Sequence, residues 1–357
     1  MKLSNKWLSR TLIGTITFVG LSTSAMADIS QRTTWTTNEA EQFLNNQTVP
    51  SQGTSAKPAA MPESTYTAPA VVNNNSIPST YNNTNTPTYS NNSSYNNYNS
   101  YNSYSAYQPN VTARAALVMD AKTGEILYKK NTTATLPIAS VTKVMTAMVT
   151  LDAGLNMHEQ ITLNASDFAG AGGKNSSSTL KVGDTMNRAE LLLFALMKSE
   201  NPAAAALGRT YPGGKYAFAQ ALNDKARSLG MYSSYFTEAS GLDPKNVSTA
   251  EDLARMVKAA VKYDVISRFS TTSSHDFNLG YRMLKSNNTN ALVRNGGWDL
   301  QLSKTGFINE AGRCVVMHAN INARPTIVVL LNARDSQSRT TDATTLFNWV
   351  AGLPQGI

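Results

Sequence analysis

The 357-residue sequence has little cysteine, little histidine and no long apolar run, and each shortage disfavours a class of protein. Its single cysteine, Cys314, allows no intramolecular disulfide, and its apolar neighbours predict a buried strand in which Cys acts as a small hydrophobe. The three histidines, His158, His275 and His318, show no metal-ligand spacing, so we expect no metal site and no cofactor. The residue counts do not exclude a Ser-His-Asp hydrolase, but the Gly-x-Ser-x-Gly motif of many such enzymes is absent.

The apolar run near the N-terminus is too short to cross a bilayer, which takes about 20 residues. Lys2, Lys6 and Arg10 precede an apolar run over 12–21, and Ala25-Met26-Ala27 follows it. Positive charge, a short apolar segment and an Ala-x-Ala site are typical of a secretory signal peptide. We expect cleavage after Ala27 and an exported, periplasmic protein with no transmembrane anchor.

Charge is sparse and weakly positive. The net charge of +8 contains three cations and no anions from residues 1–27, so the mature chain carries +5. A modest positive excess suits an anionic polymer such as a bacterial cell wall, and ordinary solubility explains it equally well. No basic run has the density that nucleic-acid binding requires, so we expect no nucleic-acid partner.

Residues 28–110 are poor in the side chains that build a core. Only Lys57 and Glu63 are charged between 46 and 110, and residues 81–110 contain ten Asn and seven Tyr but no Val, Ile or Leu. Such a segment buries too little apolar surface to offset its ordering entropy. We predict a disordered Asn/Tyr/Ser-rich tether, which acts either as a spacer or as a wall-binding segment.

The remaining chain, 111–357, predicts one α/β (α+β) domain. Strand patterns at both of its ends flank a helical block, which indicates an antiparallel sheet built from both ends, with helices packed on it and an inserted all-helical lobe. The predicted strands are 115–120 and 125–130, joined by a turn, and then 298–308, 313–322 and 326–332, with a closing helix at 340–352.

A possible nucleophile follows the first predicted hairpin. Pro137 suits the first turn of a helix that apolar residues continue to about Gly154, and Ser140 and Lys143 share a face of it at i and i+3. A lysine whose pKa is lowered by burial can take the proton of a serine hydroxyl. The same spacing recurs at Ser178 and Lys181, but there the alternation of 180–184 predicts a strand, which would point the pair to opposite sides.

Two further motifs lie later in the chain. Ser199-Glu200-Asn201 falls between a helix capped by Asn187 and Glu190 and a helix that has Pro202 in its first turn, so Ser199 and Asn201 can point into a cleft. Glu200 either tunes Lys143 or faces water, and we expect it to face water. A second helix cap is predicted at Ser248, with Glu251.

Lys304-Thr305-Gly306 lies inside a predicted strand. The glycine would let a ligand backbone approach closely, while Lys304 offers a cation and Thr305 a hydroxyl to a carboxylate.

The three motifs in this order resemble those of the serine penicillin-recognising enzymes, and the resemblance covers about 111–357. Asn201-Pro202-Ala203, Ser240-Gly241-Leu242-Asp243 and Ser248-Thr249-Ala250 look like the low-molecular-mass D-alanyl-D-alanine peptidases. Asn288-Thr289-Asn290 and Trp298–Gly306 look most like their endopeptidase branch, the penicillin-binding protein 7 type. The 51 residues after Gly306 leave no room for the β-domain and anchoring helix usual in the carboxypeptidase branch.

The resemblance implies a catalytic role for three side chains. Ser140 would attack the carbonyl of a D-alanyl peptide bond, and Lys143 would take its proton. Ser199 would relay a proton to the leaving amine, while Asn201 would hold substrate amides.

The resemblance also implies how the substrate is held. The backbone N–H groups of Ser140 and Phe307 would form an oxyanion hole. Lys304 and Thr305, next to Gly306, would bind a carboxylate beside the scissile bond.

The implied function is a serine D,D-peptidase acting on peptidoglycan, which cleaves D-Ala–diaminopimelate cross-links and is inhibited by penicillin. The alternatives are a D,D-carboxypeptidase on pentapeptide stems, a serine β-lactamase, and a non-catalytic cell-wall-binding module. The β-lactamase is disfavoured because no Glu-x-x-x-Asn-type element follows between Asn201 and Gly241.

Overall fold

The computed structural model describes residues 34–35, 108–170 and 178–354. The predicted signal peptide and its cleavage site lie outside these residues, as does most of the predicted tether. Among the described residues, no helix is long and apolar enough to cross a membrane.

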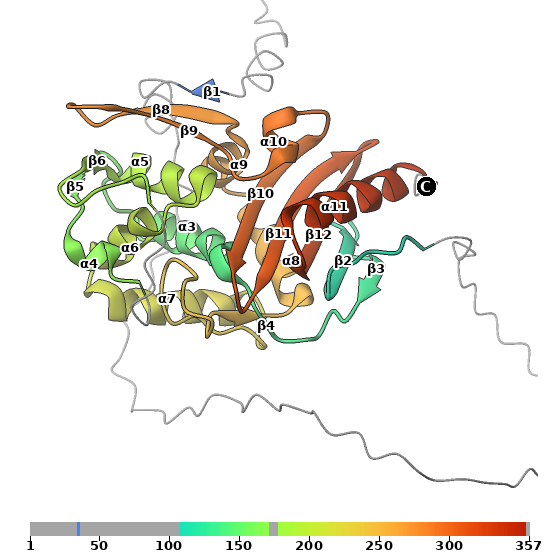
Figure 1. Ribbon diagram of the computed structural model, residues 1–357. Helices are drawn as coiled ribbons and strands as arrows, with labels where there is room; N and C mark the ends of the chain where they lie inside the picture. Colours follow the sequence, from blue (N-terminus) through green and yellow to red (C-terminus); the bar gives the residue numbers. More distant parts are fainter. Residues whose placement is uncertain (1–33, 36–107, 171–177, 355–357) are drawn as a thin grey trace, which may run out of the picture. The chain divides into compact units, whose positions relative to one another are not determined.

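A five-stranded antiparallel sheet organises the domain, in the order β10-β11-β12-β2-β3 (Figure 1). Its strands come from both ends of the domain, as the sequence predicts. β11 and β12 each contain a continuous apolar run because helices cover both faces of the sheet, and Cys314 is fully buried in β11. The strands are β2 Ala115–Asp120, β3 Ile126–Lys130, β10 Asp299–Ile308, β11 Gly312–Ile321 and β12 Arg324–Ala333.

Two apolar cores lie on the two faces of this sheet. The C-terminal helix α11 packs on one face, and α8 packs on the other beside the helical lobe (Figure 1). The lobe lies between β3 and β10 in the chain, which confirms the predicted insertion. The helices are α3 Thr142–Asp152, α4 Ala165–Phe168, α5 Arg188–Leu193, the π-helical turn η3 Phe194–Lys198, α6 Asn201–Arg209, α7 Gly214–Ser228, α8 Ala250–Ala260, α9 Asp264–Thr271, α10 Ala291–Asn295 and α11 Ser336–Ala351.

Short strand pairs also lie in the inserted segment between β3 and β10, so the lobe is not all-helical as the sequence predicts. The pairs are β4 Leu136–Pro137 with β7 Val247–Ser248, β5 Gln160–Thr162 with β6 Thr185–Asn187, and β8 Ser274–Asn278 with β9 Met283–Asn287. Strand β1, Thr34–Trp35, pairs in parallel with β8. Two residues of the predicted tether therefore form a strand.

The sequence analysis predicted the wrong start for the helix that follows Ser140. Pro137 lies in β4, opposite Val247, and Ala139 adopts a left-handed backbone (φ +48°) that no α-helix contains. A 3₁₀ turn, η1 Ala139–Val141, carries Ser140, and the α-helix begins only at Thr142. The i, i+3 relation to Lys143 survives because the turn and the helix are continuous.

Two other local predictions are also wrong. Residues 180–184 form a turn, in which the Asp184 carboxylate accepts a hydrogen bond from the Lys181 N–H (2.8 Å). The cap of α8 is Thr249, whose hydroxyl accepts from the Asp252 N–H (3.1 Å), because Ser248 is engaged in β7.

Two glycines let neighbouring backbone segments press against the residues around Ser140. A Cβ on Gly241 would come within 1.9 Å of the Ala139 carbonyl oxygen, and a Cβ on Gly306 within 2.8 Å of the Ile138 carbonyl oxygen. Gly306 therefore allows Ile138 and Ala139 to pack closely against β10. The sequence analysis predicted instead that this glycine makes room for the backbone of a ligand.

We expect Gly241→Ala to unfold the domain more readily than the matched change Gly280→Ala. Both glycines have nearly the same positive φ (+81° and +80°), so both variants carry the left-handed strain of about 1–2 kcal/mol. A Cβ on Gly280 has nothing within 4 Å, whereas at Gly241 it collides with backbone, which adds roughly 1–3 kcal/mol. Denaturant unfolding measures the difference, and equal losses in the two variants would contradict it.

Candidate active site

The buried ammonium group of Lys143 is the centre of the candidate site. Its Nζ donates to Ser140 Oγ (2.8 Å), Asn201 Oδ1 (2.6 Å) and the Ser240 carbonyl oxygen (2.6 Å). Its side chain is fully buried, and three oxygen atoms satisfy its three donors. The structure thus brings together Ser140 and Asn201, 61 positions apart, through one lysine.

Burial lowers the pKa of Lys143 to about 7, although the carboxylates of Glu238 and Glu200 act in the opposite direction. A lysine with this pKa is partly neutral at neutral pH, and only the neutral amine can accept a proton from Ser140. The arrangement therefore supplies a base within hydrogen-bond distance of a serine hydroxyl.

A second buried lysine lies in the strand opposite. Lys304 on β10 donates to Ser199 Oγ (2.8 Å) and to the Thr305 carbonyl oxygen (2.9 Å). Burial lowers its pKa well below the ordinary value, and the positive charges of Lys143 and Arg339 lower it further. Ser199 therefore bridges from the helical lobe to the sheet.

Thr305 has a partner that the sequence prediction missed as a site component. Its hydroxyl lies 2.6 Å from that of Thr289, whose N–H donates to the Met197 carbonyl oxygen just before Ser199 (3.1 Å). The flanking Asn288 and Asn290 are buried and hydrogen-bonded, so this loop is rigidly held. The sequence Asn288-Thr289-Asn290 could have indicated this role of Thr289, but it entered the sequence analysis only as part of the family resemblance.

Glu238 is a second missed component. Its carboxylate accepts from the N–H groups of Ser240 (2.5 Å) and Gly241 (2.6 Å), and so fixes the loop whose Ser240 carbonyl receives Lys143. Thr146 on α3 donates to the neighbouring Ala239 carbonyl oxygen (2.7 Å). Nothing in the local sequence pattern marks this role, because it depends on a fold contact.

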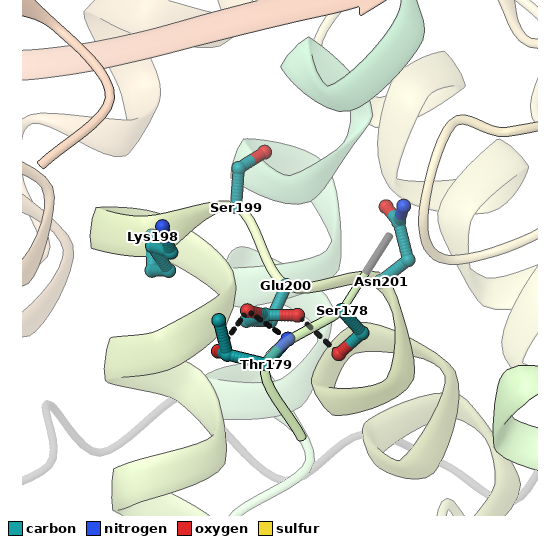
Figure 2. A pocket seen from close by; sticks show the side chains of 6 residues that line it. All are labelled: Ser178, Thr179, Lys198, Ser199, Glu200 and Asn201. Carbon is teal, nitrogen blue, oxygen red and sulfur yellow. Dashed lines mark hydrogen bonds between the residues drawn. The ribbon is translucent and has the colours of Figure 1, made fainter. Parts of the chain in front are cut away.

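The expectation that Glu200 faces water is wrong. Its side chain is only 5% exposed, and it accepts hydrogen bonds from the hydroxyls of Ser178 (2.6 Å) and Thr179 (2.6 Å) (Figure 2). Ser178 is therefore engaged with Glu200, which agrees with rejecting Ser178 and Lys181 as a catalytic pair. Ser178, Thr179 and the 198–201 turn line a pocket of about 230 Å³.

The predicted oxyanion-hole residues lie on the facing backbones of η1 and β10. A Cβ on Gly306 would come within 3.1 Å of the Ser140 nitrogen, so the backbones of η1 and β10 approach closely there. The Phe307 side chain is 44% exposed, with the Arg313 guanidinium 3.6 Å from its ring centroid. Phe307 can thus contribute its backbone to the site while its ring lies at the surface.

The sheet, the inserted lobe and two serine–lysine pairs define the class of serine D,D-peptidases. The sequence pattern of the peptidase family S11, described as D-alanyl-D-alanine carboxypeptidase, matches residues 102–335. The chain belongs to this family.

Individual members of this family are similar to the chain to different degrees. A D-alanyl-D-alanine endopeptidase of Pseudomonas aeruginosa is 43% identical over 250 residues, which cover 68% of this chain and 78% of the relative. The D-alanyl-D-alanine carboxypeptidase DacC of Escherichia coli is 29% identical over 249 residues, covering 68% and 62%. Penicillin-binding protein D2 of Listeria monocytogenes, solved with bound cefotaxime, is similar in structure, with a TM-score of 0.60, 30% identity and coverage of 68% and 99%.

We expect the Lys143 ammonium to lose its proton near pH 7, because burial penalises its charged form. Side-chain NMR of lysine nitrogens would follow this titration, with Lys143→Arg assigning the signal. An exposed lysine, which titrates at about 10.4, serves as the internal reference. A Lys143 signal that titrated with the exposed lysines would contradict the expectation.

Proposed function

We propose that this protein is a serine D,D-peptidase whose nucleophile is Ser140. The observation that carries the proposal is the short contact between Ser140 Oγ and Lys143, a lysine whose pKa burial lowers to about 7. Neutral Lys143 accepts the hydroxyl proton as Ser140 attacks the carbonyl carbon of a D-alanyl peptide bond, which gives a tetrahedral intermediate. The acyl-enzyme forms when the C–N bond of this intermediate breaks and the amine leaves.

The second serine–lysine pair supports the proton transfer to the leaving group. Ser199 lies within hydrogen-bond distance of Lys304, and Asn201 shares Lys143 with Ser140. In the proposed reaction Ser199 relays a proton to the departing amine, and the Asn201 amide holds a substrate amide. Water then hydrolyses the ester on Ser140.

The carboxylate next to the scissile bond binds at β10. Lys304 and Thr305 supply an amine and a hydroxyl there, and Thr289 holds the Thr305 hydroxyl in place. A bound carboxylate favours the charged form of the Lys304 amine, because it supplies the opposite charge that the buried group lacks. The N–H groups of Ser140 and Phe307 receive the developing oxyanion, and each such donor is typically worth about 10²–10³ in rate.

The proposed substrate is the D-Ala–diaminopimelate cross-link of peptidoglycan, which makes the enzyme an endopeptidase. The carboxylate site alone does not select it, since a D-Ala-D-Ala terminus presents the same group as the D-centre of diaminopimelate. Support comes from identity, since the relative named an endopeptidase is 43% identical and the one named a carboxypeptidase 29%. Action on this polymer, together with the signal-like residues 1–27, leads us to propose a periplasmic location.

Digestion of purified muropeptides tests the proposal. The mature protein should convert cross-linked dimers to monomers, and Ser140→Ala should lower that rate by about 10⁴-fold or more, as loss of a catalytic serine does. Ser336→Ala, at the start of α11, is the matched serine control and should keep the wild-type rate. Loss of pentapeptide termini with intact dimers would replace the endopeptidase proposal by a carboxypeptidase.

Penicillin should acylate Ser140, and the penicilloyl group should be released from the serine only slowly. Glu238 is the only glutamate between Asn201 and Gly241, and its carboxylate accepts two backbone N–H groups, which disfavours it as the base for a deacylating water. Labelled penicillin followed by chase with unlabelled drug measures the release. Rapid turnover of the label would instead indicate a β-lactamase.

A further inference from the structure

The residue between Ser199 and Asn201 is a buried carboxylate. Glu200 is 5% exposed and turns toward Ser178 and Thr179, away from the direction in which Ser199 and Asn201 point (Figure 2). It accepts both hydroxyls at 2.6 Å and the Thr179 N–H at 3.3 Å. Burial of an acidic group is costly unless hydrogen bonds satisfy it, and the three hydrogen bonds to Glu200 do so. They therefore hold the carboxylate in this one position.

The two hydroxyl donors do not lie on a free loop. The hairpin of β8 and β9 holds their segment, since Arg282 donates to the Thr179 carbonyl oxygen (3.1 Å) and to Asp184 (2.6 Å). The Tyr281 hydroxyl donates to the other oxygen of Asp184, whose residue is only 1% exposed. Contacts therefore run from this hairpin through 178–184 to Glu200.

The turn that Glu200 anchors has an unfavourable backbone. Ser199 has φ +67°, a left-handed conformation that costs a non-glycine residue on the order of 1–3 kcal/mol and persists only when its surroundings enforce it. The Glu200 N–H donates to the Phe194 carbonyl oxygen (3.2 Å), and the Glu200 side chain supplies a second anchor by its contact with Ser178.

We propose that Glu200 is a positioning residue, which fixes the directions of Ser199 and Asn201 by anchoring the turn between them to Ser178 and Thr179. This inference rests on the proposed function, because it assigns Ser199 and Asn201 their parts in the same reaction. Loss of the anchor lets the turn relax, and a displacement of about 1 Å at catalytic groups costs about 10²-fold in rate.

The charge of Glu200 gives the proposal a second, independent readout. The charged groups that face Lys143 are Glu200, Glu238 on the 237–246 loop and Lys304 on β10. The two carboxylates raise the pKa of Lys143 against its burial, so removing one of them lowers it. Neutral Lys143 then persists to lower pH, and the acidic limb of the acylation profile moves to lower pH.

Acylation by a fluorescent penicillin, measured from pH 5 to pH 9, tests the proposal. Glu200→Ala should slow acylation by about 10²-fold, from misplacement of the turn. Glu200→Gln, which keeps the shape, should recover much of that rate with the acidic limb displaced to lower pH. Glu251→Gln is the matched control, since Glu251 also accepts a threonine hydroxyl (Thr132, 2.7 Å) but contributes nothing to the site, and it should leave rate and profile unchanged.

A double-mutant cycle identifies the path of the effect. Ser178→Ala with Thr179→Val should slow acylation, and adding Glu200→Ala to this pair should cost little more, because both changes remove the same anchor. Additive losses, an unmoved acidic limb, or a Glu200→Ala rate equal to wild type would each overturn the proposal. A wild-type protein that penicillin does not acylate would instead refute the proposed function.

Discussion

The burial of two lysine ammonium groups is the constraint on which the rest of the site depends. In the part of the chain that the structure describes, neither Lys143 nor Lys304 forms an ion pair with a carboxylate, and both are almost completely removed from water. A buried cation is costly unless oxygen atoms replace its hydration shell. Here serine hydroxyls, an amide and backbone carbonyls do so, and they come from the lobe, the 237–246 loop and the sheet.

These oxygen atoms come together at the edge of the sheet that β10 forms. β10 is the outermost strand of the five, so within the described residues one side of it has no strand partner, and the η1 turn that carries Ser140 packs against β10. An unpaired edge is normally a liability for aggregation. In this domain it is covered by the segment that bears the proposed nucleophile, and Gly306 permits that contact.

Sequence reasoning found the sheet, the inserted lobe and the three motifs, because strand alternation, helix caps and motif order are local signals. It failed where partners lie far away in the chain. Pro137 is extended because β4 pairs with Val247, and Ser248 caps no helix because its hydroxyl contacts Ser234 and its backbone pairs with Leu136.

The remaining errors have the same cause. Glu200 is buried because Ser178 and Thr179 reach it from another segment, so its neighbours in the chain gave no indication. The roles of Thr289 and Glu238 depend likewise on where folding brings Thr305 and Ser240.

The single cysteine of β11 has a chemical consequence for the whole domain. Burial raises the pKa of Cys314 to about 11, so its sulfur stays a protonated thiol at neutral pH and lies beyond the reach of solutes. A thiol reacts with electrophiles and oxidants chiefly as the thiolate. Thiol-directed reagents therefore leave Cys314 of the folded domain unmodified, and they can be used without altering the proposed nucleophile, Ser140.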